Sequence, residues 1–387
     1  MCTPDALDLV AAWGGCPKNN WAERAAETFG QRESKSTEPT VLINVGANKG
    51  YNAASFLSLW STARNMTIRK WSNAITNYAR GVSNGTSWKH GYLAFNQCGA
   101  CGACRARGPK AHGRNSGKVH MLELLQSNRQ LLRHLCAETN VCDLAQVHDF
   151  AASNVTRVEQ APGLSAKAGV EYKSLAWPNI SQRSLRKFDS TVQAITIDEF
   201  MQRQQLRRVF TVDIDTEGWD ALVLEGMHAT LSEHRVTFVE FEYSGRGYWS
   251  NSTPSDERRT LERTLAWMFK LGYVCFMESG KHLAQISGPC WRPQYERQRW
   301  SNVLCAQDPQ ALSLLHGMAK RGYEERTQRQ SNKRLRSRNE KSKSRRRHGS
   351  KEHSVSKAPK RSTQVPPIVE CPPYVRVVRG SCFFSIG

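Results

Sequence analysis

The segment T-V-L-I-N-V-G-A-N-K-G, residues 40–50, decides the fold class. Its first six residues, 40–45, form a compact and mostly apolar run that is typical of a buried strand. Gly46 and Gly50 then frame a short loop, and apolar side chains recur at helical spacing over residues 53–60. A strand, a glycine loop and a helix in this order indicate an open α/β sheet, in which ligands bind beyond the carboxyl ends of the strands.

The glycine loop fits a ligand site, although it also fits an ordinary strand-to-helix turn. Gly46 permits a tight turn and a close backbone approach, and the N–H groups that begin a helix attract anionic groups. Glu123 follows a second apolar strand over residues 119–122. A carboxylate placed there can accept both ribose hydroxyls of an adenosine cofactor; the alternative is an acid that caps a helix in solvent. Ser153, in a small polar turn after a third strand, is a candidate to border the adenine.

Strand-like and helix-like patterns alternate along the rest of the chain. We expect further strands near residues 146–151, 192–196, 209–214, 236–241, 273–277 and 303–305. Helices are expected near 126–138, 219–231 and 256–271, with a short one that begins at residue 198. This alternation predicts an α/β fold, with a mostly parallel sheet and helices on both faces.

Composition divides the chain into a lead-in, a central domain and a tail. Hydrophobic residues make up 39% of the 387 residues, which suits a globular protein. Residues 1–39 are expected to be a polar lead-in with a helix near residues 5–13, and residues 40–307 are expected to form the α/β domain. Within it, the Gly-, Asn- and Cys-rich stretch 61–117 is expected to be an insertion after the first helix.

Most of the net charge of +21 lies in the tail, residues 308–387. Residues 320–361 carry 17 Lys or Arg against four Glu, a net charge of +13. Such low-complexity Ser/Arg/Lys composition buries too little apolar surface to fold, so we expect the tail to be largely disordered. It could bind polyanions such as RNA weakly, or act as a solvated linker.

The cysteines leave several interpretations open. Cys98, Cys101 and Cys104 could bind zinc with a fourth ligand, form disulfides or line a loop, and no metal is assigned. The histidines available as a fourth ligand are His90, His112 and His120. Five N-x-S/T sequons hint at a secretory route, whereas the twelve cysteines do not settle the compartment. The first residues lack the basic start of a secretory signal, so the compartment stays open. No apolar run approaches the roughly 20 residues needed to cross a bilayer.

The strongest block is V-D-I-D-T-E-G-W-D, residues 212–220, which leads into L-V-L-E-G at 222–226. Further blocks, in chain order, are I-N-V-G-A-N-K-G (43–50), L-E-L-L-Q-S-N (122–128), A-I-T-I-D-E-F (194–200) and V-E-F-E-Y-S (239–244). Over residues 41–244 the chain resembles the FkbM family of methyltransferases. The D-x-E-G block is specific to the family, whereas the glycine loop is shared by many nucleotide-binding folds.

The resemblance implies a Rossmann-like class I methyltransferase fold with S-adenosylmethionine as the methyl donor. It also implies O-methylation of a hydroxyl on a glycan or small-molecule acceptor. By position, the residues that line the methionine end of the cofactor are Asn44, Gly46, Asn48 and Gly50. Asn44 stands where the family usually has Asp, and an amide cannot supply charge to the cofactor's ammonium group. The resemblance therefore implies weakened cofactor binding that Asn44→Asp restores.

Methyl transfer is a displacement at an activated sulfonium, so catalysis comes largely from holding the nucleophile close to the methyl group. A hydroxyl nucleophile also benefits from a general base. We expect Asp215 to be that base, followed by Glu217 and Glu240, whereas Asp213 and Asp220 are expected to cap or to be solvated. The alternative is a catalytically impaired methyltransferase-like module that binds nucleic acid through its basic tail.

Overall fold

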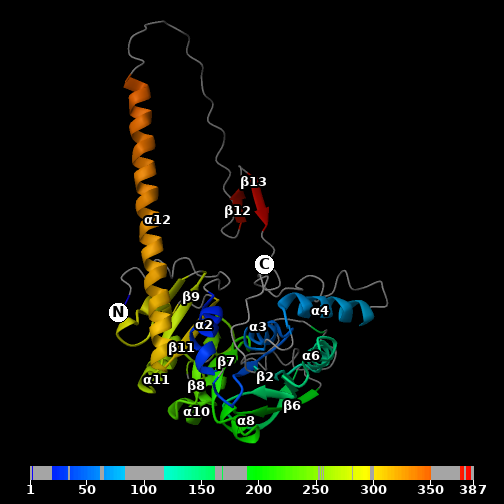
Figure 1. The fold of residues 1–387 in the computed structure, drawn as a ribbon. Helices are drawn as coiled ribbons and strands as arrows, with labels where there is room; N and C mark the ends of the chain where they lie inside the picture. The colour runs from blue at the N-terminus through cyan, green and yellow to red at the C-terminus, as the bar shows by residue number, and fades with distance from the viewer. Residues whose placement is uncertain are drawn as a thin grey trace. The chain divides into compact units, whose positions relative to one another are not determined.

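The computed structural model describes most of the central domain and parts of both ends (Figure 1). The described residues are 20–33, 35–61, 65–82, 117–161, 190–251, 257–280, 282–296, 300–349, 375–378 and 381–384, with the single residues 2, 168, 253 and 255. The Cys98, Cys101 and Cys104 cluster and the helix expected near residues 5–13 lie outside them.

A central sheet of eight described strands has the order β10-β9-β11-β8-β7-β1-β2-β3. The strands are β1 (Val41–Val45), β2 (Lys118–Leu122), β3 (Ala145–His148), β7 (Val209–Ile214), β8 (Val236–Tyr243), β9 (Val274–Ser279), β10 (His282–Gln285) and β11 (Ser301–Ala306). From β8 to β3 all neighbouring strands are parallel, whereas β11, β9 and β10 join through antiparallel pairs. The expected α/β fold with a mostly parallel sheet is confirmed.

The order of the strands reverses between β1 and β7. From β1 the chain adds β2 and then β3 on one side, and it later returns to add β7 and β8 on the other side. In an open α/β sheet such a reversal leaves a crevice beyond the carboxyl ends of the two central strands. The residues that follow β1 and β7 therefore lie at the position where this Rossmann-like arrangement binds ligands.

Helices cover both faces of the sheet, and each face has its own apolar core. One core contains residues of α8 (Ile197–Arg203), α9 (Asp220–Glu225), α10 (His228–Ser232) and α11 (Leu261–Lys270). The other contains residues of α2 (Trp21–Glu33), α3 (Tyr51–Trp60), α4 (Ile68–Val82), α6 (Gln126–Glu138) and α12 (Pro309–Gly349).

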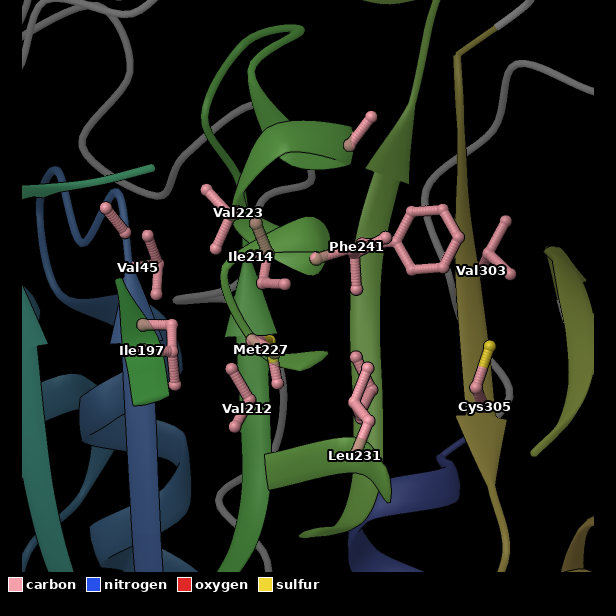
Figure 2. Close-up of a cluster of buried hydrophobic side chains, with 14 of the residues drawn as sticks. Val45, Ile197, Val212, Ile214, Val223, Met227, Leu231, Phe241, Val303 and Cys305 are labelled. Carbon is pink, nitrogen blue, oxygen red and sulfur yellow. The ribbon is translucent and has the colours of Figure 1, made fainter. Parts of the chain in front are cut away.

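The first core shows why the apolar runs of the sequence become central strands. Figure 2 shows Val45, Ile214, Phe241 and Val303 pointing to the same face from four adjacent strands, with Met227 packed against them. Every residue of β1 and of β7 is buried, as expected for parallel strands covered on both faces. The sheet thus provides a rigid base for the loops at its carboxyl edge.

Part of the expected insertion belongs to the core. Residues 68–82 form α4, whose Trp71 and Ile75 are fully buried and whose contacts are with α3 and α6. The amphipathic spacing within this stretch was hidden by its polar composition, because Lys, Asn and Arg occupy only the outer face. Gly50 fixes the packing: a Cβ there would lie 2.7 Å from the Trp71 ring.

The tail also begins differently from the prediction. The domain boundary expected at residue 307 is too early, since Ala311 and Leu315 of α12 are fully buried in the second core. The segment to residue 349, expected to be disordered, is helical, because Lys, Arg, Gln and Glu are good helix formers and the buried first turns provide a nucleus. The chain divides into two compact units, 1–328 and 329–387, and the second contains a hairpin of β12 (Val375–Val378) and β13 (Ser381–Phe384). Among the described helices, none is long and apolar enough to span a membrane.

Smaller differences follow from tertiary contacts. The third expected strand splits into β3 and β4 (Phe150–Ala152), and β4 joins β5 (Arg157–Ala161) and β6 (Ser190–Ile195) in a separate small sheet. The helix expected over residues 219–231 is interrupted at Gly226, where a Cβ would lie 2.1 Å from the Ser153 carbonyl oxygen. Short 3-10 helices occur at Gly247–Trp249, Gly288–Cys290 and Pro293–Tyr295. Among the described residues, Cys2 and Cys290 form a disulfide, and so do Cys275 and Cys305.

Candidate functional site

The loop after β1 is locked against the loop after β7. Gly46 has a φ of 75°, and its N–H donates to the Leu122 carbonyl at 3.0 Å. A Cβ on Gly46 would lie 1.9 Å from the carbonyl oxygen of Asp215, so only glycine fits here. In return, the Asp215 N–H donates to the Val45 carbonyl at 3.0 Å. The glycine loop and the D-x-E-G block therefore meet at the reversal of strand order.

Glu123 supports this loop from the end of β2. It is 5% exposed, and its Oε2 accepts a hydrogen bond of 2.7 Å from the Asn48 N–H while Oε1 accepts from the Leu125 N–H at 2.8 Å. Asn48 has a left-handed φ of 45°, which is part of the turn that brings its N–H to the carboxylate. Burial raises the pKa of Glu123, while these backbone donors oppose the shift. The ribose contact expected of Glu123 would have to use the remaining lone pairs of these oxygens.

Asn44 faces a carboxylate rather than open space. Its Nδ2 donates to Asp213 Oδ2 at 3.0 Å, and Asn52 Nδ2 of α3 donates to the same oxygen at 2.5 Å. Asn44 and Asp213 are register partners on β1 and β7, and both are buried. Burial, and then Glu240 and Asp215, raise the pKa of Asp213 well above its ordinary value. Two amides thus stabilise a buried acid that was expected to cap a helix or to be solvated.

Three carboxylates meet near the carboxyl ends of β7 and β8. Asp215, Glu217 and Glu242 each offer one oxygen, and these oxygens lie within 4.8 Å of one another. Asp215 is exposed, Glu217 is half-buried and Glu242 is buried. Burial, followed by repulsion from Asp215, raises the pKa of Glu242 well above its ordinary value, and the Glu242 side chain is hydrogen-bonded to Asp215. The arrangement can accept a proton or bind a cation.

Glu217 is held in place by the loop after β8. Its φ is 55°, and its Oε2 accepts from Arg246 Nη1 at 2.5 Å. A Cβ on Gly218 would lie 2.6 Å from the Arg246 carbonyl oxygen, and one on Gly247 would lie 2.4 Å from the Gly218 carbonyl oxygen. The two loops therefore touch through their backbones, which fixes the direction of Glu217.

Asp220 braces the same loop and is neither the helix-capping nor the solvated acid that was expected, since α9 has no side-chain cap bond. Its two carboxylate oxygens accept from the N–H groups of Thr216 and Gly218 at 3.1 and 3.0 Å. It is fully buried, and burial followed by repulsion from Asp215 raises its pKa to about 7. All of its oxygens are directed at backbone, so it shapes the site without facing it.

Glu240 does not join the acids of the edge. It lies two residues earlier on β8, in register with Asp213, and its Oε1 accepts from Asn302 Nδ2 at 2.6 Å. Burial, and then the charge of Glu278, raise its pKa well above the ordinary value. Glu240 is half-buried and apart from this cluster, whereas Glu242 is the acid of this strand that lies with Asp215 and Glu217.

Ser153 also has an internal partner. It is fully buried, and its Oγ accepts from the Trp219 Nε1–H at 3.2 Å. Since Trp219 directly follows Gly218, this bond anchors the D-x-E-G block to the end of β4. Its position indicates a supporting role, and contact with an adenine stays a prediction.

The glycine loop offers groups that suit the methionine end of the expected cofactor. Asn44 Oδ1 and Asn48 Oδ1 are buried acceptors without a hydrogen-bond partner among the described residues, as an incoming ammonium group would require. Directly beyond Gly50, the first N–H groups of α3 can receive a carboxylate. The donor and acceptor set therefore fits an amino acid moiety.

Part of the chain matches a known protein family. Residues 97–275 match the family model of the methyltransferase FkbM domain, a range that includes Glu123, Asp215, Glu217 and Glu242 but not the glycine loop. No curated protein matches the chain.

Two of the solved structures that are similar are also methyltransferases. One is the methyltransferase domain of METTL16, with 7% identity, a TM-score of 0.30 and coverage of 74% of this chain. The match spans 66% of that domain's length. The other is an O-methyltransferase from Bacillus cereus in complex with SAH, with 11% identity, a TM-score of 0.31 and coverage of 78% of this chain and 88% of that one.

Proposed function

We propose that this chain, an S-adenosylmethionine-dependent methyltransferase that matches the methyltransferase FkbM domain over residues 97–275, methylates a hydroxyl oxygen of a glycan or small metabolite. The observation that carries this proposal is the place of Asp215. It is exposed, it follows β7 at the reversal of strand order, and its backbone is in contact with the glycine loop. An acceptor hydroxyl bound to Asp215 would therefore lie beside the cofactor loop.

In the proposed arrangement the loop residues Asn48 and Gly50 hold the methionine end of the cofactor. The Nδ2 of Asn44 helps to keep Asp213 in position, and its Oδ1 remains an uncharged acceptor for the ammonium group. Glu123 keeps the loop in its bound shape and offers its remaining lone pairs to the ribose. When bound, S-adenosylmethionine supplies the electrophilic methyl group.

Asp215 is the proposed general base. Its exposure lets it reach an acceptor, whereas Glu242 behind it is buried and hydrogen-bonded to it. A hydroxyl that loses its proton as the bond to the methyl carbon forms gains from a nearby carboxylate, typically by a factor of roughly a hundred or more. Glu217, fixed by Arg246, is the second polar contact for the acceptor.

The test separates the two groups of residues. Asp215→Asn keeps the side-chain shape and should leave the cofactor affinity unchanged while slowing transfer roughly a hundredfold or more. Glu123→Ala removes two hydrogen bonds to the loop region and should weaken cofactor binding tenfold or more. Glu262→Gln, an exposed change on α11, is the control. The proposal fails if Asp215→Asn turns over at the wild-type rate with an accepted hydroxyl substrate.

The basic tail has a separate proposed role as a weak, sequence-independent polyanion contact. Its net charge of +13 over residues 320–361 supports this, since Lys and Arg side chains neutralise phosphates and release counterions. The tail is not needed for methyl transfer in this proposal, because the acids of the site all lie within unit 1–328.

A further inference from the structure

The buried acids of the carboxyl edge differ in how their oxygens are satisfied. Glu123, Asp213 and Asp220 each accept two hydrogen bonds from N–H donors of described residues. Glu242 is buried to the same degree, at 5% exposed, but its Oε2 has no hydrogen-bond partner within the described part of the chain. A buried carboxylate oxygen without a donor is costly, so a positively charged ligand is the missing partner.

We infer that Asp215, Glu217 and Glu242 form a site for a hard divalent cation, Mg²⁺ or Ca²⁺. Three carboxylate oxygens from the ends of two adjacent strands are the donor type these ions prefer. Metal–oxygen distances of about 2.0–2.6 Å place opposite ligands about 4–5 Å apart, which matches oxygens that lie within 4.8 Å of one another.

The charges around the cluster fit a divalent ion. Arg246 pairs with Glu217 at 2.5 Å, and its side chain is 39% exposed. When all three acids are ionised, as they would be around a bound cation, they and this guanidinium leave a net charge of −2, which a divalent cation neutralises. Asp215 is exposed and gives the ion an entry route, whereas Glu242 supplies a buried anchor and Glu217 is fixed by the contact of Gly218 with the loop after β8.

A bound cation would also take part in the proposed methyl transfer. This catalytic role rests on the proposed function. The acceptor's hydroxyl oxygen would complete the coordination, which lowers the pKa of that hydroxyl. Each carboxylate is needed as a ligand through one oxygen only, so the other oxygen of Asp215 can take the proton. The oxygen–carbon bond then forms as the bond from carbon to the cofactor's sulfur breaks. The products are the methyl ether, S-adenosylhomocysteine and a proton.

Direct binding tests the site without turnover. Purified full-length protein, free of chelator, is titrated with Mn²⁺ by electron paramagnetic resonance and with Mg²⁺ and Ca²⁺ by calorimetry, before any cofactor is added. We expect one bound ion, and at least tenfold weaker binding in Glu242→Gln and in Asp215→Asn. Glu262→Gln makes the same Glu-to-Gln exchange at an exposed position of α11, outside the cluster. It should bind the ions as tightly as the wild type does. Circular dichroism checks that each variant is folded.

Two results overturn the inference: no saturable binding by the wild type, or equal binding by the wild type, Glu242→Gln and Asp215→Asn. The same preparations are titrated with S-adenosylmethionine, so that the two claims fail separately. Cation binding without cofactor binding leaves the site standing and removes the proposed function. Cofactor binding without cation binding removes the cation site and leaves the proposed function standing.

Discussion

The side-chain amide of Asn44 donates a 3.0 Å hydrogen bond to Asp213, its register partner on the neighbouring strand β7. The resemblance to FkbM methyltransferases treats Asn44 as a weakened cofactor ligand. The structure gives the amide a different task, because a carboxylate at position 44 would face the Asp213 carboxylate in a buried environment. The amide donor of Asn44 thus complements the carboxylate acceptor of Asp213. An acid at one of these two positions disfavours an acid at the other.

The first prediction is that Asn44→Asp destabilises the fold instead of tightening cofactor binding. Two buried carboxylates in contact cannot both be ionised, so the change should cost about 1–3 kcal/mol at neutral pH. The cost should shrink as the pH falls, since a protonated carboxyl can again donate to Asp213. Urea unfolding at neutral and mildly acidic pH measures both effects, with Asn140→Asp at an exposed left-handed position as the control. Tighter cofactor binding with unchanged stability would contradict this account.

The second prediction concerns two glycines with opposite surroundings. Gly46→Ala places a Cβ 1.9 Å from the Asp215 carbonyl oxygen at a φ of 75°, so it should separate the two loops. We expect a loss of more than about 2 kcal/mol of stability and of measurable cofactor binding. Gly81→Ala in α4 meets nothing within 4 Å and should be neutral or stabilising by up to about 1 kcal/mol. Thermal melting of both variants measures these changes in stability. Only a small loss of stability in Gly46→Ala would show that the two loops are not locked together.

The third prediction is a loss of stability in acid caused by the pair of a buried histidine, His120, and a half-buried one, His148. His120 Nδ1 and His148 Nε2 lie 3.0 Å apart on β2 and β3, an interaction that needs one neutral ring to accept. Burial, then His148 and Lys118, lower the pKa of His120 to about 4, and burial also lowers that of His148. Because the folded pKa lies below the ordinary 6.5, this stability is complete above about pH 6.5 and is lost as the pH falls through about 4.

The size of this loss of stability follows from how far the pKa of His120 is lowered. Between about pH 7 and pH 4 the His120 ring should account for on the order of 3 kcal/mol of the free energy of unfolding. His120→Gln keeps a neutral hydrogen-bonding group and should flatten the pH dependence over this range. Denaturant unfolding at several pH values provides the comparison. Parallel curves for the wild type and His120→Gln would rule the pair out as the cause.

Some features of the fold follow from the local sequence pattern, whereas others depend on the register of neighbouring strands. β1, β7 and β8 were predictable because continuous apolar runs next to glycine loops fit only buried strands, and Gly46, Glu123 and Asp215 followed from their places at strand ends. Glu240 and Glu242 lie two residues apart on one strand, so they share a face. Only the pairing of β8 with β7 tells which one reaches the edge.

Other features depended on contacts that no local signal carries. Asp213 looked like a surface acid, although Asn44 and Asn52 from distant segments bury it. In α4 a polar composition concealed a buried stripe around Trp71, and Gly226 divides one helical pattern in two because of its contact with Ser153.

The fourth prediction revises where the tail can be removed. Gly322 packs against His282, so a cut before residue 320 would damage the domain, whereas the boundary between the compact units follows residue 328. A protein lacking residues 329–387 should melt like the full chain and retain methyl transfer. It should bind heparin more weakly, with a shallower dependence on salt, because most of the positive charge is gone. Loss of transfer in a folded truncation would contradict a purely accessory tail.

Calorimetric titration of the full-length protein with S-adenosylmethionine tests the central claim most directly. We predict saturable binding at one site per chain, weakened tenfold or more by Glu123→Ala and unchanged by Asp215→Asn and Glu262→Gln. Absence of binding by the folded wild-type protein would contradict the assignment of the glycine loop as a cofactor site, and would leave the chain a methyltransferase-like module without the methyl donor.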